Sequence, residues 1–135
     1  IVDGLRAIDA VEPQLTNVVH RLAIDCMGIT ARLVAVTLAT PLVAEAAGAA
    51  ATAVLDAPAW LGHDGRLERL PVGWHVTSDS IAAIVASEVG AALVLAKSVP
   101  PPHDDIERLA AAGWVDGWFP VASRPLSVIE WVAPP

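Results

Sequence analysis

The stretch from Trp74 to Ser98 constrains the fold more than any other part of the chain. It opens with Thr77-Ser78-Asp79-Ser80, whose short polar side chains are typical of a helix start because they accept bonds from the free N–H groups of a first turn. Apolar residues then recur at helical spacing as far as Gly90, a residue type that often ends a helix. The apolar run from Ala91 to Ala96 is typical of a strand buried on both faces of a parallel sheet. This order predicts an α/β fold, in which ligands usually bind at the C-terminal ends of the strands.

The rest of the chain continues the alternation of helices and strands. A helix is predicted over Val2–Val11, and a long second helix begins at a cap on Thr16 or Asn17, ends near Leu38 and is covered on more than one side. The sequence therefore predicts a three-layer α/β sandwich around a mostly parallel sheet, formed by one domain over residues 1–135. The further elements that we expect are short strands at Leu42–Val43 and Thr52–Leu55, an Ala-rich helix or turn at Glu45–Ala51, loops at Asp56–Trp60 and 62–73, a helix at Asp104–Ala112 capped by Asp104, and a final strand at Leu126–Val132.

Composition and charge exclude several classes of function. Hydrophobic residues make up 55% of the chain, and the net charge is −7, which argues against a nucleic-acid surface because such a surface needs clustered Lys and Arg. No apolar run reaches the length of a membrane span, and no signal peptide is visible, so we expect no membrane partner. Cys26 is the only cysteine, so no disulfide can form within the chain, and we expect a cytoplasmic location.

Four motifs, taken in order along the chain, resemble the amino acid kinase superfamily, which includes the aspartate, glutamate, acetylglutamate and uridylate kinases. These motifs are VDGLRAIDA, HRLAIDCM, WHVTSDSIAA and LAKSV. Their order is most similar to the branch of (aminomethyl)furan-methyl phosphate kinases of methanofuran biosynthesis and to bacterial relatives in one-carbon metabolism. The resemblance implies an ATP-dependent kinase that uses Mg²⁺ to phosphorylate a small molecule.

The resemblance also assigns roles to particular residues. Asp79 matches the acid that organises the catalytic lysines around the transferring phosphoryl group, although a helix cap is an equal explanation of this residue. Lys97 matches the nucleotide loop, and the alternative is a solvated lysine at a strand end. His20 matches a residue on the acceptor side, and the alternative is a structural histidine. The remaining site residues that we expect are Ser78 and Ser98 at the nucleotide and Thr77 at the substrate. His63, His75 and His103 are too scattered for the close spacings typical of zinc sites, so we predict no zinc site, and no metal, held by the protein alone.

Two parts of the kinase pattern are missing from these 135 residues. There is no Gly-Gly-Ser phosphate loop, and no lysine follows Lys97. We therefore expect the C-terminal portion of a kinase fold without its N-terminal strands, either as a homo-oligomer or with a partner chain that supplies the missing part. The alternatives are a non-catalytic subunit of the same fold that binds a nucleotide or anion, and an unrelated α/β domain.

The tryptophans lie mainly in predicted loops or near strand ends. Trp114, Trp118 and Phe119 flank the pair Asp116-Gly117. Exposed tryptophans can stack on a purine, but we favour an interface or a lid here.

Overall fold

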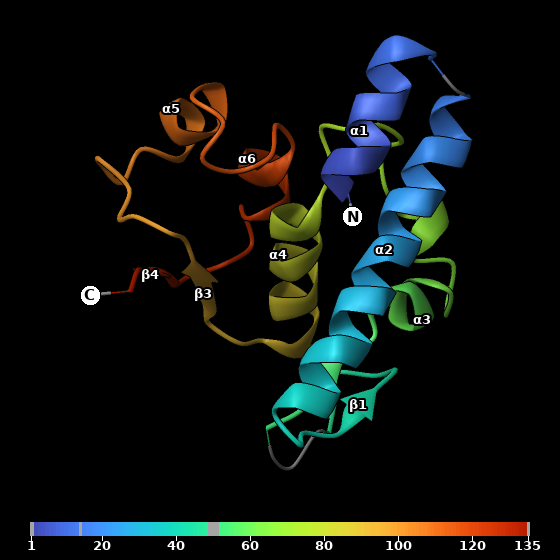
Figure 1. Cartoon of the computed structure of the whole chain (residues 1–135). Helices are drawn as coiled ribbons and strands as arrows, with labels where there is room; N and C mark the ends of the chain where they lie inside the picture. The colour runs from blue at the N-terminus through green and yellow to red at the C-terminus, as the bar shows by residue number, and fades with distance from the viewer. Residues whose placement is uncertain (1, 14, 49–51, 135) are drawn as a thin grey trace. The chain divides into compact units, whose positions relative to one another are not determined.

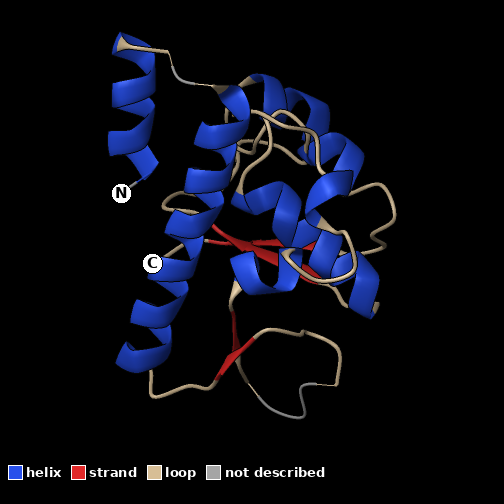
Figure 2. Ribbon diagram, turned by 90° about the vertical axis from the view of Figure 1, so that its right-hand side faces the viewer, coloured by secondary structure: helices blue, strands red, loops and turns tan. Residues whose placement is uncertain are grey.

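The computed structural model describes residues 2–13, 15–48 and 52–134, and it confirms a mixed α/β chain with short parallel strand pairs (Figure 1). The chain divides into two compact units, residues 1–73 and residues 74–135, and each is described by itself. Helices, drawn in blue in Figure 2, take up far more of the chain than the short red strands. In the described parts of the chain, the strands form two separate pairs, β1 with β2 and β3 with β4, where the sequence had predicted one sheet between two layers.

The first unit is built on a helical hairpin. The predicted first helix is confirmed as α1, Val2–Val11, and the long helix α2 spans Thr16–Thr37. A short parallel pair follows, with Leu42 opposite Val54 and Val43 opposite Leu55. The elements of this unit after α2 are β1 (Leu42–Val43), β2 (Val54–Leu55), α3 (Ala57–Leu61) and the 3-10 helix η1 (Leu67–Arg69). The Ala-rich element predicted at Glu45–Ala51 is a turn at residues 47 and 48, and its last three residues lie outside the described chain.

Several predictions in the first unit were wrong in detail. The cap of α2 is Leu15, whose side chain makes no capping bond, so neither Thr16 nor Asn17 has that role. The segment expected to be a functional loop folds into α3, because the Asp56 carboxylate accepts the Ala59 N–H and proline occupies the first turn. The region 62–73, expected to be exposed, contains buried residues, namely Arg66 and Leu70.

Arg66 is buried, and its guanidinium group has several partners within the first unit. Its Nη1 donates to Glu45 Oε1 at 3.0 Å and to the Trp60 carbonyl at 3.1 Å, and its Nη2 donates to Glu45 Oε2 at 3.3 Å. The guanidinium carbon lies 4.6 Å from the centre of the Trp60 ring. This cluster joins the segment after β1 to the segment after α3.

The second unit follows the predicted order of helix and strand. Helix α4 spans Ser78–Val89 and ends at Gly90, whose φ of +67° is the left-handed cap that the sequence predicted. Strand β3 (Leu93–Ala96) then pairs in parallel with β4 (Ile129–Val132), with Leu93 opposite Ile129. Two short helices, α5 (Ile106–Ala111) and α6 (Phe119–Ala122), lie between the two strands in sequence.

The structure corrects two predictions in the second unit. Strand β3 is buried on one face only: Leu93 and Leu95 are buried, whereas Val94 is 51% exposed. Leu93 and Leu95 pack into the core of the second unit, so β3 shows the alternation of a strand that is covered on one face. The cap of α5 is Asp105, whose carboxylate accepts the Arg108 N–H at 3.0 Å, and not Asp104.

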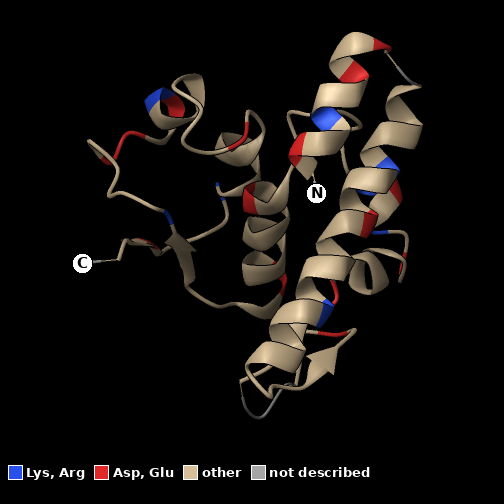
Figure 3. Cartoon of the chain, in the orientation of Figure 1, with Lys and Arg blue, Asp and Glu red and all other residues tan. Residues whose placement is uncertain are grey.

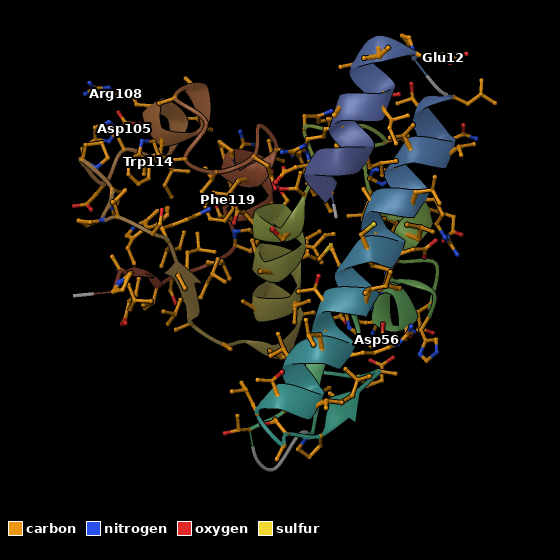
Figure 4. All side chains as sticks on the ribbon, viewed as in Figure 1. Glu12, Asp56, Asp105, Arg108, Trp114 and Phe119 are labelled. Carbon is orange, nitrogen blue, oxygen red and sulfur yellow. The ribbon has the colours of Figure 1, made fainter. Side chains whose placement is uncertain are left out.

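The core of the second unit forms around Leu109 and Phe119, which are fully buried. Figure 4 labels Phe119, together with Trp114. Trp114 and Trp118 are partly buried and pack against this core. Because both tryptophans keep exposed surface while they pack against this core, the preference for a lid or an interface here stays a prediction. Across the described parts of the chain, no helix is long and apolar enough to cross a membrane.

Candidate functional site

The start of α4 and the end of β3 bring together two residues that lie eighteen positions apart in the sequence. Lys97 Nζ donates to Asp79 Oδ1 at 3.0 Å and to Asp79 Oδ2 at 2.9 Å. The side chains of Asp79 and Lys97 are 17% and 21% exposed. An ion pair that is this well shielded and bound through both carboxylate oxygens holds the lysine in one place.

The backbone fixes both members of this pair. Asp79 is the second residue of α4, where a negative charge is favoured by the partial positive charge of the helix start. Lys97 directly follows β3, and its N–H continues the strand pairing by donating to the Val132 carbonyl at 2.9 Å. The ammonium group therefore sits at the C-terminal end of a parallel strand.

Asp116 caps α4 from a distant part of the sequence. Its Oδ2 accepts the N–H groups of Thr77 and Ser80, each at 2.9 Å, and the Thr77 hydroxyl at 3.0 Å. Its Oδ1 accepts the Ser80 hydroxyl in a short bond and the Trp118 N–H at 3.2 Å. In a capping box these two backbone N–H groups are bonded by side chains of the helix itself, whereas here one carboxylate bonds both.

Because Asp116 caps α4, the polar residues at the start of this helix have other roles. Thr77 makes no capping bond of its own, Ser80 is fully buried, and Asp79 uses its carboxylate on Lys97. The explanation of Asp79 as a plain side-chain cap was therefore wrong. Sequence reasoning did not select Asp116 as a site residue; its one visible signal was an acid followed by glycine between two tryptophans.

The remaining predicted residues differ in accessibility. Ser78, on the first turn of α4, and Ser98, directly after Lys97, are both exposed. His20 is a buried residue of α2 in the first unit, where its Nδ1 accepts the Gly73 N–H at 3.4 Å. The structure thus brings Asp79, Lys97, Thr77, Ser78 and Ser98 to the second unit, and it gives His20 a bond within the first.

The charges of the site limit what it can bind. The site has two negatively charged carboxylate groups, on Asp79 and Asp116, and one positively charged ammonium group, on Lys97. Figure 3 shows the positions of lysine and arginine, in blue, dispersed along the ribbon of the described residues. Within the described residues, no three of His, Cys, Asp and Glu cluster in a way that could hold a metal ion. A bound polyphosphate would therefore need a cation that accompanies it or comes from another chain.

Comparisons with known proteins identify no family: no family model, no curated protein and no solved structure matches this chain.

Proposed function

We propose that the chain provides the nucleotide-binding portion of an ATP-dependent small-molecule kinase similar to the amino acid kinases. The observation that carries this proposal is the position of Lys97, which Asp79 holds at the end of β3 through both carboxylate oxygens. Phosphoryl transfer depends chiefly on positioned charge, and an acid that fixes a lysine at a strand end suits this task. The three-layer kinase sandwich and the cytoplasmic location are part of the same proposal.

In this proposal each residue has a defined task. MgATP lies against Lys97, with the exposed hydroxyl groups of Ser78 and Ser98 beside the phosphates, and Thr77 serves the acceptor. The bond between the β-phosphate oxygen and the γ-phosphorus breaks as the acceptor oxygen bonds that phosphorus, the proton of the acceptor passes to solvent, and ADP leaves. The Lys97 ammonium group offsets the negative charge, and Mg²⁺ enters with the nucleotide. A second chain or segment supplies the glycine loop that these 135 residues lack.

A second candidate is a non-catalytic subunit that binds a nucleotide or anion. The observation that favours it is the local charge: Asp79 already pairs with Lys97, and Asp116 already caps α4. Less charge is therefore available to stabilise a transferring phosphoryl group, and binding without turnover does not require that stabilisation.

Calorimetric titration of MgATP into the full chain tests both candidates. Lys97→Ala should weaken binding about tenfold, since one charge-assisted bond is lost. Asp104→Asn removes an exposed charge near α5 and should leave the affinity unchanged. Failure of the wild-type chain to bind MgATP would overturn the nucleotide assignment in both candidates.

Turnover of ATP separates the two candidates. If the chain is catalytic, alone or with its partner, Asp79→Asn should reduce ADP release by roughly 100-fold or more while MgATP still binds, because the positioning charge is lost. MgATP binding with no ADP release from the wild type, alone or with a co-purified partner, would favour the non-catalytic subunit. Equal turnover in Asp79→Asn and wild type would contradict the role of Asp79.

A further inference from the structure

Different parts of the second unit hold the two members of the ion pair between Asp79 and Lys97. Lys97 follows β3, and its backbone is fixed by the strand pairing, because its N–H donates to the Val132 carbonyl at 2.9 Å. Asp79 lies in the first turn of α4, so its carboxylate meets the ammonium group only while that turn keeps its place. The contacts that hold the first turn of α4 therefore also decide where the lysine side chain lies.

The first turn of α4 is held by a residue from outside the helix. Its N-cap residue, Thr77, makes no capping bond with its own side chain. The N–H groups of Thr77 and Ser80, which lie on either side of Asp79 in sequence, both donate to Asp116 Oδ2 at 2.9 Å. The hydroxyl groups of the same two residues also donate to the Asp116 carboxylate. Asp116 thus fixes the backbone both before and after Asp79.

The rest of α4 is anchored by other contacts. Ala83 and Ala86, on its second and third turns, are buried in the core of the second unit. Loss of the Asp116 carboxylate should therefore loosen the first turn and leave the body of the helix in place. The carboxylate is itself fixed at the start of α6, because its Oδ1 accepts the Trp118 N–H at 3.2 Å.

We propose that Asp116 is a positioning residue for Lys97, because it holds the turn of α4 that keeps Asp79 at the ammonium group. The dependence runs from Asp116 through Thr77 and Ser80 to Asp79, and from Asp79 to Lys97. The consequence for phosphoryl transfer rests on the proposed function, whereas the position of the lysine can be measured without a nucleotide. Failure of the chain to bind MgATP would leave this measurement unaffected.

The rate at which an amine-acylating reagent modifies Lys97 tests the proposal. Lys97 is the only lysine of the chain, so mass spectrometry of the peptide that contains it measures this rate, relative to a free lysine peptide in the same reaction. The amine must leave Asp79 before it can react, so Asp116→Ala should raise the rate roughly tenfold. The matched control is Asp105→Ala, which removes the cap of α5 in the same unit and should keep the wild-type rate.

A combined variant tests whether Asp116 acts through Asp79. Asp79→Ala alone should react at least as fast as Asp116→Ala, and adding Asp116→Ala should raise the rate no further, since the lysine is already released. A wild-type rate in folded Asp116→Ala would overturn the proposal, as would rate increases that multiply in the combined variant. If circular dichroism shows that Asp116→Ala does not fold, Asp116→Asn, whose amide oxygen still accepts one or two of the bonds, takes its place. This variant should react at an intermediate rate, and a wild-type rate would again overturn the proposal.

Discussion

At the scale of single residues, the most informative side chain is Asp116. It bonds two backbone N–H groups and one hydroxyl group at the start of α4, and it also bonds a buried serine hydroxyl. The position of Asp79, and through it that of Lys97, depends on this turn of helix. A residue absent from the kinase-like motifs therefore holds in place the residues that those motifs contain.

Replacement of Asp116 tests this dependence. Asp116→Ala should lower the free energy of unfolding by roughly 2–4 kcal/mol, because buried Ser80 and the α4 N–H groups lose their acceptor. Asp116→Asn should lose less, since its amide oxygen still accepts one or two of these bonds. Urea denaturation of both variants gives the comparison. If Asp116→Ala is as stable as the wild type, the capping role assigned to Asp116 is wrong.

At the scale of elements, the contact between α2 and α3 depends on the absence of a side chain at Gly28. A Cβ atom at this position would lie 2.9 Å from Pro58 Cγ and 3.3 Å from Asp56 Oδ1. The proline ring is rigid and Asp56 caps α3, so neither neighbour can move away at low cost. Gly28 thus allows the close approach of the two helices, whereas in an isolated helix it would only weaken α2.

A pair of glycine substitutions separates packing from helix propensity. Gly28→Ala should destabilise the protein by about 1–3 kcal/mol, because overpacking outweighs the gain in helix propensity. Gly4→Ala in α1 should stabilise it slightly, by about 0.5–1 kcal/mol, because no atom lies within 4 Å of its Cβ position. Thermal unfolding of the two variants should therefore shift in opposite directions. An upward shift for Gly28→Ala would contradict the tight α2–α3 contact.

At the scale of the whole molecule, Glu45 links protonation to the stability of the first unit. Its pKa is lowered from the ordinary value, first by the hydrogen bonds from Arg66 and then by the bond with His63. A carboxyl group with a lowered pKa in the folded state contributes stability at neutral pH and loses that contribution as the pH falls through the lowered pKa.

The acid side of the stability profile should therefore depend on Glu45. Between about pH 5 and about pH 3, the wild type should lose stability more steeply than Glu45→Gln, in which this proton-linked contribution is absent. Glu68→Gln, which removes a charge from η1, should retain the wild-type slope. Urea denaturation across this pH range measures the slopes. Parallel profiles for the wild type and Glu45→Gln would refute the link.

Local patterns in the sequence determined those elements whose ends and apolar periodicity are visible in their own residues. The end of α4, the helix α1 and the strands at Leu42–Val43 and Leu93–Ala96 follow from Gly90 and apolar periodicity. The polar residues 77–80 marked where α4 starts, although Asp116 caps it. The proximity of Asp79 and Lys97 was also predictable. In a parallel α/β unit, the start of a helix lies beside the C-terminal end of the strand that follows it.

The tertiary structure alone decided which distant groups meet. Asp116 replaces the local cap of α4, Arg66 is buried between Glu45 and Trp60, and β3 is covered on the one face that packs into the core of the second unit. Each of these outcomes depends on the path of the chain between segments that are not adjacent in sequence. A polar residue in a predicted loop carries no local sign of the partner that will bury it, so periodicity and capping rules could not have identified these contacts.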